Sequence, residues 1–148
     1  MAEVRAAKGP RRRSREIALQ ALYAWQMGSG DALEQVRAID DDGRTDRDLA
    51  EALVRGVQAR AAELEGLIAP CLDREFRRLS PVERAILYIG AFELQAHPET
   101  PFKVVINEAI ELGKSFGGAG GHKYVNGVLE KLARGLRAQE TAGGRQPA

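Results

Sequence analysis

Four arginines near the beginning of the chain are the densest group of one chemistry in the sequence. The first fifteen residues carry six basic side chains and one acidic side chain, a net charge of +5 in a chain whose net charge is +1. The group contains Arg11, Arg12, Arg13 and Arg15. Guanidinium groups bind phosphate oxygens in pairs and stack on exposed bases, which suits single-stranded RNA. A solvated tail that only aids solubility is an equally acceptable interpretation of the same residues.

A second set of polar side chains follows the glycine-rich run at residues 117–121. Lys123, Tyr124 and Asn126 lie there, near the expected start of a helix. Glycine allows close approach to a phosphodiester backbone, a helix N-terminus attracts phosphate, and a tyrosine ring can stack on a splayed base. The structural alternative is that Tyr124 belongs to the core, the glycines form a linker and Asn126 is a local cap.

Catalytic and metal-binding chemistry finds little support. The two histidines, His97 and His122, and the single cysteine, Cys71, do not have the spacing of metal ligands. The glycine run lacks the Lys-Ser/Thr ending of a phosphate-binding loop. Glu108 and Glu111 are three residues apart and could resemble a catalytic pair of carboxylates, but solvated helix faces carry such pairs routinely. We therefore expect no enzyme, with no catalytic residue, no cofactor and no metal.

The composition predicts a cytoplasmic globular protein. The 148 residues fit one domain, and 44% of them are apolar while 29% are charged. No stretch approaches the roughly 20 consecutive apolar residues that a transmembrane helix requires, and no apolar region follows the basic N-terminus as in a secretory signal. A single cysteine excludes an internal disulfide and fits a reducing compartment.

Helical periodicity and capping signals predict an all-α fold. Apolar residues recur at helical spacing in five substantial segments and one or two short ones, and no alternating β-pattern of useful length is present. The clearest start is Ser-Pro-Val-Glu at residues 80–83, with serine at N-cap, proline at N1 and glutamate at N3. The helix after it, to about Ala96, is apolar on most faces and belongs at the centre of a bundle.

The same signals predict three parts of the chain. We expect a flexible basic arm over residues 1–13, a helical RNA-binding domain over residues 14–138 and a disordered tail over residues 139–148. Ser14 is a suitable N-cap for the first helix of the domain. Thr45 opens a sequence like a capping box, before one long amphipathic helix.

Three blocks of sequence resemble the NusB transcription-antitermination family. The first is RRRSRE followed by ALYAWQ, the second is PFKVVINEAIELGKSF and the third is HKYVNGVL. They occur in the family's order and with compatible spacing between about Arg11 and Arg137. Together the blocks are far more specific than any one of them.

The resemblance implies a fold, a function and partners. The family fold is a compact helical bundle in which two three-helix subbundles pack together. Members bind boxA-type single-stranded RNA together with the ribosomal protein NusE. They act in a Nus-factor complex on RNA polymerase, which supports ribosomal RNA transcription, and some of them form homodimers.

Position within the blocks implies two groups of contact residues. The RNA-binding group would be Arg11, Arg12, Arg13, Arg15, Lys114, Lys123, Tyr124 and Asn126. The partner-binding group would be Tyr23 and Glu83, although Glu83 also fits its capping position. Family members often carry acidic residues before the position of His122, where this chain has glycines and one alanine. Fewer negative charges should reduce repulsion of RNA, whereas greater flexibility should raise the cost of ordering the loop.

Two other interpretations stay open. A similar helical domain forms the N-terminal part of some RNA cytosine methyltransferases, which also need a cofactor-binding α/β domain and a nucleophilic cysteine. A purely structural helical dimer is the other interpretation, and it predicts self-association that does not depend on RNA.

Overall fold

The computed structural model describes residues 9–39, 43–118 and 120–145. The chain forms two compact units, Met1–Ala59 and Arg60–Ala148. All regular structure in the described ranges is helical, which confirms the predicted all-α class. Residues 1–8 of the predicted arm and residues 146–148 of the predicted tail lie outside the described residues.

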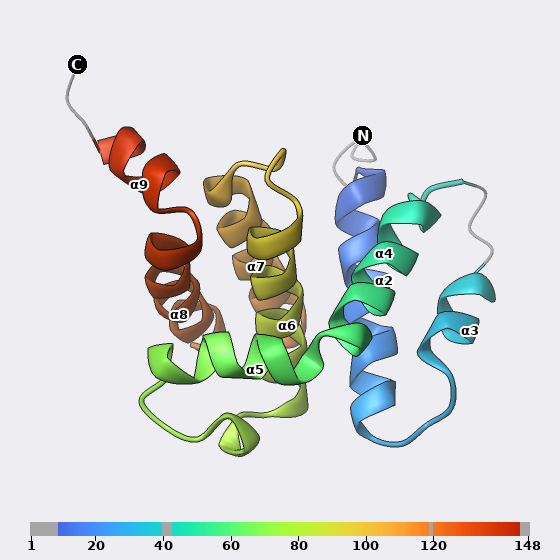
Figure 1. Ribbon diagram of the computed structural model, residues 1–148. Coiled ribbons are helices and arrows are strands. Elements are labelled where there is room, and N and C mark those ends of the chain that lie inside the picture. Colours follow the sequence, from blue (N-terminus) through green and yellow to red (C-terminus); the bar gives the residue numbers. More distant parts are fainter. Residues whose placement is uncertain (1–8, 40–42, 119, 146–148) are drawn as a thin grey trace. The chain divides into compact units, whose positions relative to one another are not determined.

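The first unit contains three helices, α2 (Pro10–Gln26), α3 (Ala32–Arg37) and α4 (Arg47–Ala59) (Figure 1). Each of the three contacts the other two. Apolar side chains at helical spacing on each helix are buried, among them Ile17, Leu22, Val36, Leu53 and Val57. The unit is therefore a three-helix bundle, as the family resemblance implies.

The first helix begins earlier than the sequence predicted. Pro10 is its first residue and Gly9 its N-cap. Proline suits this position because its fixed φ is already helical and its missing N–H would have no partner there. Ser14 is thus no N-cap; it is buried inside the helix, with its hydroxyl 2.8 Å from the carbonyl oxygen of Pro10 and 2.5 Å from that of Asp46. The predicted flexible arm is consequently wrong for residues 10–13.

The predicted long helix is two helices. It starts at Arg47 after Asp46, whose side chain accepts the N–H of Leu49 at 3.1 Å, so the cap is one residue later than predicted. At Arg60 the backbone leaves the helical region, with φ −119° and ψ 19°. The apolar spacing continues through this break, which is why the sequence pattern did not reveal it.

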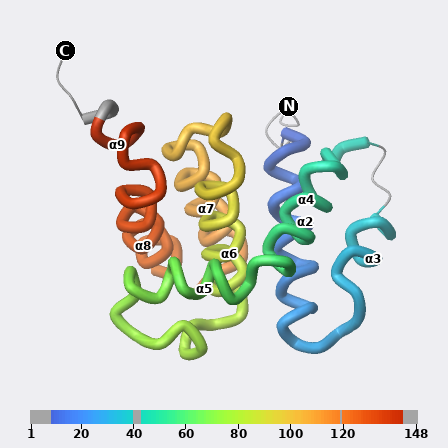
Figure 2. The backbone as a smooth tube through the Cα atoms, viewed as in Figure 1, coloured from blue at the N-terminus to red at the C-terminus, as the bar shows by residue number. Residues whose placement is uncertain are grey.

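The second unit holds the remaining helices, which are α5 (Ala61–Ile68), η1 (Ala69–Cys71), η2 (Phe76–Arg78), α6 (Pro81–Ala96), α7 (Phe102–Phe116), α8 (Gly121–Leu136) and α9 (Ala138–Arg145). Helix α6 contacts α5, α7 and α8, and α5 crosses near one end of these helices (Figure 2). Every residue from Ala85 to Leu94 in α6 is buried, which confirms its predicted central place. Helix α9 shows that the predicted disordered tail is wrong as far as Arg145.

The predicted capping box at the start of α6 is confirmed. The Ser80 hydroxyl accepts the Glu83 N–H at 3.1 Å, and a Glu83 carboxylate oxygen accepts the Ser80 N–H at 3.1 Å. Pro81 occupies the first helical position. The two side chains satisfy N–H groups that a helix N-terminus otherwise leaves without partners.

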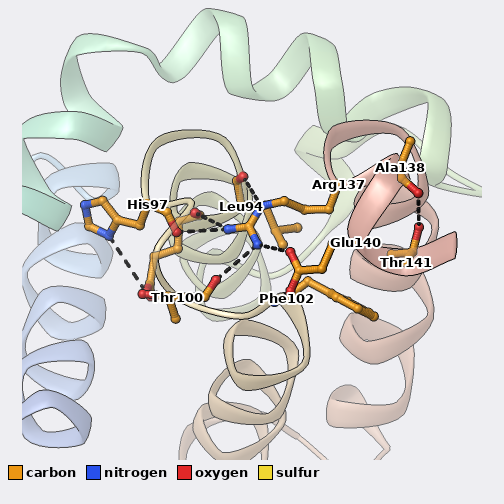
Figure 3. Close-up of polar contacts among 9 residues, drawn as sticks. Leu94, His97, Thr100, Phe102, Arg137, Ala138, Glu140 and Thr141 are labelled. Atoms are coloured by element: carbon orange, nitrogen blue, oxygen red, sulfur yellow. Dashed lines mark hydrogen bonds and ion pairs between the residues drawn. The ribbon is translucent and has the colours of Figure 1, made fainter. Parts of the chain in front are cut away.

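A buried arginine joins the other end of α6 to the end of α8. The side chain of Arg137 is 7% exposed, and its guanidinium donates to four backbone carbonyls, which belong to Glu93, Leu94, His97 and Thr100 (Figure 3). It also pairs with Glu140 at 2.6 Å. A helix C-terminus leaves carbonyls without backbone donors, and Arg137 supplies N–H groups there, adding to the backbone N–H groups that the Glu93 and His97 carbonyls already accept.

Glu140 extends this junction to α7. One carboxylate oxygen faces Arg137, and the other accepts the N–H of Phe102, the first residue of α7, at 2.8 Å. The Phe102 N–H and the Arg137 guanidinium lower the pKa of Glu140. A single carboxylate thus serves both a helix N-terminus and a buried cation.

Replacing Arg137 with methionine should lower the free energy of unfolding by about 2–4 kcal/mol, because buried carbonyls lose their donor while the apolar stem is kept. Arg134→Met is the matched control, since Arg134 lies on the exposed side of the same helix. Chemical denaturation followed by circular dichroism measures both. Equal midpoints for the two variants would show that the Arg137 contacts contribute no net stability.

Two substitutions of Glu83 should separate its hydrogen bond from its charge. Glu83→Gln keeps an acceptor for the Ser80 N–H and should cost at most about 0.5 kcal/mol, the size of a helix-dipole contribution. Glu83→Ala loses the acceptor too and should cost about 1–1.5 kcal/mol. Thermal unfolding checks the order, and a glutamine variant as unstable as the alanine variant would contradict it.

Candidate nucleic-acid interface

The first turns of α2 present the arginine group on an ordered helix. The side chain of Arg11 is 52% exposed and lies 3.8 Å from a carboxylate oxygen of Asp46. The side chain of Arg13 is 36% exposed and lies 3.5 Å from the buried carboxylate of Glu16. Arg12 also has an interaction partner. The positive charges stand at the positive end of the helix dipole, where an anion is favoured.

The structure corrects the expectation for Arg15. This residue is 3% exposed and has an interaction partner. Because the helix begins at Pro10 and not after Ser14, Arg15 lies in its second turn and on its buried face. A direct RNA contact by Arg15 therefore does not fit this structure. Tyr23, the predicted partner contact, is 40% exposed on the same helix.

A close approach of two helices positions the second set of residues. A Cβ on Gly113, near the end of α7, would lie 2.9 Å from the Cα of His122 in α8, so only glycine fits. Gly120 then starts α8 with φ +80°, a left-handed conformation that glycine adopts without strain. This turn brings Lys114, in the last turn of α7, close to the beginning of α8. Lys114 is exposed and lies 3.7 Å from a carboxylate oxygen of Glu111.

Tyr124 is half-buried, so it is neither a core residue nor a fully exposed ring for a base, the two alternatives that the sequence left open. Its hydroxyl donates to an Asp73 carboxylate oxygen at 3.0 Å, and the guanidinium carbon of Arg74 lies 4.6 Å from the centre of its ring. Burial and the hydrogen bond to Asp73 raise the pKa of the Tyr124 hydroxyl. Hydrogen bonds from Arg74 and Tyr124 lower the pKa of Asp73, so its carboxylate is charged at neutral pH. The ring is thus held by a cation and an anion before any ligand arrives.

A shallow hollow of about 170 Å³ lies beside this ring. Its walls combine two lysines of α8 with the cluster around Tyr124, and they are Cys71, Asp73, Lys123, Tyr124, Gly127, Val128 and Lys131. Gly127 leaves open space where a Cβ would be. Burial raises the pKa of the Cys71 thiol, so the hollow offers no reactive thiolate. Asn126 is half-buried one turn further along α8 than His122.

Glu83 lies near the start of α8. One of its carboxylate oxygens is 3.6 Å from the position of a Cβ on Gly121, while the other belongs to the capping box. Its charge also contributes to the raised pKa of Arg74, after the larger effect of Asp73. Glu83 therefore adds negative potential beside the Tyr124 cluster.

Sequence reasoning missed three residues of this region. Lys131 follows Lys123 by two helical turns, and this spacing could have revealed it. Asp73 and Arg74 lie in the segment between η1 and η2, and Tyr124 is 51 residues further along than Asp73. No periodicity connects such a segment with a helix, so only the fold could bring them together.

The described part of the chain contains no group of three or more His, Cys, Asp and Glu side chains arranged to hold a metal ion. Within the same ranges, no helix has the length and apolar character needed to cross a lipid bilayer.

Known proteins are similar to this chain in both sequence and fold. The sequence profile of the NusB family matches residues 12–134. The protein named transcription antitermination protein NusB from Paraburkholderia phytofirmans is 49% identical over 142 residues, which cover 94% of this chain and 99% of the relative. Its name describes an antitermination protein rather than an enzyme, in agreement with the absence of catalytic motifs.

Two solved structures resemble the fold. T. maritima NusB matches with a TM-score of 0.76 and 30% identity, covering 86% of this chain and 92% of that one. NusB in a complex of the antitermination factors NusB and NusE with double-stranded RNA matches with a TM-score of 0.70, covering 84% and 96%. Its 24% identity supports the fold alone. The profile match and the identity over nearly the full length establish that the chain belongs to the NusB family.

Proposed function

We propose that this protein is a transcription antitermination factor that binds boxA-type single-stranded RNA together with the ribosomal protein NusE. The observation that carries the proposal is the set of exposed cations at the starts of α2 and α8 in a chain of the NusB family. In this role it belongs to a Nus-factor complex on RNA polymerase, supports ribosomal RNA transcription and works in the cytoplasm.

The RNA contacts belong to both units. In the first unit, Arg11, Arg12 and Arg13 supply guanidinium groups for phosphates at the positive end of α2. In the second unit, Lys114 and Lys123 add charge, the Tyr124 ring offers a surface for a base, and Asn126 offers an amide. Both sets suit a flexible single strand, because contacts with phosphates and base faces do not require a duplex groove.

NusE is proposed as the protein partner because a structural relative was solved in a complex of NusB and NusE with RNA. Tyr23 is an exposed aromatic side chain in the first unit, and Glu83 is a half-buried acidic side chain in the second unit. Each is proposed to contact the partner. Glu83→Gln, which keeps the capping hydrogen bond, isolates the contribution of its charge to partner affinity.

The decisive experiment is a binding titration of fluorescent boxA-type RNA and a scrambled strand, with and without NusE, at two salt concentrations. Tighter binding of the boxA strand that NusE strengthens supports the proposal. Equal, weak and salt-sensitive binding of both strands contradicts it. Self-association measured by light scattering, with no response to either strand, would favour the structural dimer instead.

Replacing Arg11, Arg12 and Arg13 with alanine should weaken RNA binding about tenfold or more and reduce the log–log salt slope by about 2, roughly 0.7 for each lost phosphate contact. Helix content should stay intact, because alanine is a strong helix former. Filter binding and circular dichroism measure the two effects.

The matched control replaces Arg37, Arg47 and Arg55, three other arginines of the first unit, with alanine. It removes the same charge from residues of α3 and α4, outside α2. If the control weakens binding as much as the test variant does, only the overall charge matters and the α2 arginines are not the contact.

Tyr124→Ala should reduce RNA affinity by about 1–3 kcal/mol if the ring stacks on a base. Tyr124→Phe keeps the ring and removes only the hydroxyl that donates to Asp73, so it should retain most of the affinity. Isothermal calorimetry gives the affinities and thermal unfolding gives the stabilities. Loss of stability with unchanged affinity would make Tyr124 a structural residue.

A further inference from the structure

We propose that Arg74 is an additional RNA contact. Without RNA its guanidinium is paired with the Asp73 carboxylate, and an RNA phosphate replaces that carboxylate on binding. This inference rests on the proposed RNA-binding function and adds a residue and a form of regulation to the α8 region. It is carried by the contacts among Asp73, Arg74 and Tyr124.

The carboxylate of Asp73 binds one edge of the Arg74 guanidinium. Nε lies 2.7 Å from one carboxylate oxygen, and Nη2 lies 3.3 Å from the other. Two roughly parallel N–H contacts to two oxygens are also the geometry by which arginine binds phosphate. The edge that Asp73 covers is therefore the edge that a phosphate group would use.

The Tyr124 ring holds the same guanidinium in place. The guanidinium carbon lies 4.6 Å from the ring centre, and the ring hydroxyl donates to the oxygen that Nε also contacts. A planar cation over an aromatic face is attracted by the negative face of the ring. Arg74 is thus kept beside the aromatic ring, where less freedom is lost when a ligand binds.

The Asp73–Arg74 pair is accessible and exchangeable. The two side chains are 66% and 50% exposed, and ion pairs in such solvated positions are weak. Lys123 and Lys131 line the adjoining hollow, and Gly127 leaves space between them. A strand of RNA brings several phosphates to these cations, and the release of its counterions favours the exchange. The carboxylate leaves Arg74 when a phosphate arrives, and no covalent bond changes.

This arrangement gives neighbouring residues opposite effects on RNA affinity. Arg74→Ala should weaken binding of the boxA-type strand about tenfold and lower the log–log salt slope by about 0.7. Asp73→Asn removes the competing charge and should tighten binding about threefold or more. In the Arg74→Ala background, Asp73→Asn should lose most of this gain, because there is no guanidinium left to release.

Arg77→Ala and Glu75→Gln are the matched controls. Arg77, in η2, is 81% exposed and pairs at 3.2 Å with Glu75, which Arg78 also contacts at 3.4 Å. These changes therefore alter charge equally near the Asp73–Arg74 pair. All variants are measured by fluorescence anisotropy with the full chain, and their thermal unfolding should match that of the unchanged protein. The expected result is a larger effect at Arg74 and Asp73 than at the controls.

The outcomes separate the inference from the proposed function. If the unchanged protein fails to distinguish boxA-type RNA from the scrambled strand, the proposed function fails. If it distinguishes them but Arg74→Ala equals Arg77→Ala, or Asp73→Asn gains as much without Arg74 as with it, only the inference fails. Loss of NusE binding in Arg74→Ala without RNA would place the residue at a protein interface and also overturn the inference.

Discussion

The contacts of the buried Arg137 guanidinium fix how the second unit is built. Its four carbonyl acceptors lie at the end of α6 and in the turn before α7, while Glu140 joins it to the first N–H of α7. The ends of three helices are thereby tied to one side chain. At the opposite end of α8, Gly113 packs closely against His122. This contact positions the first turn of α8, which carries Lys123 and Tyr124. These two constraints hold the helix that carries the second set of cations.

A basic surface that is to bind RNA must also be stable without it. The cations that we assign to RNA are accordingly placed beside carboxylates: Arg11 near Asp46, Arg13 near Glu16 and Lys114 near Glu111. Like charges on neighbouring residues repel each other, and a carboxylate within reach reduces that cost. The same carboxylates compete with phosphate. Affinity is therefore a difference between two sets of ion pairs, and both sets weaken in salt.

Local signals in the sequence predicted which segments are helical. They were less successful at predicting where the helices begin and end and which residues come into contact. Ser80 and Glu83 act within four residues of each other, so the start of α6 could be predicted and was confirmed. Apolar residues on most faces likewise predicted that α6 lies at the centre of its unit. The burial of Arg15 depends on the exact first residue of α2, and the pairing of Arg74 with Tyr124 depends on the path of an irregular segment. Neither is encoded in a local pattern.

The position of Arg137 in the chain has a consequence for the order of folding during synthesis. Its carbonyl acceptors, from Glu93 to Thr100, are made 37–44 residues before it. Before Arg137 is synthesised, the Leu94 and Thr100 carbonyls lack its N–H groups and must be hydrated, whereas the Glu93 and His97 carbonyls already accept backbone N–H groups at 3.0 Å. The first unit, Met1–Ala59, is a compact unit of its own, and its whole sequence is made long before Arg137. We therefore expect the growing chain to fold in two stages, with the second completed only after α8 has been synthesised.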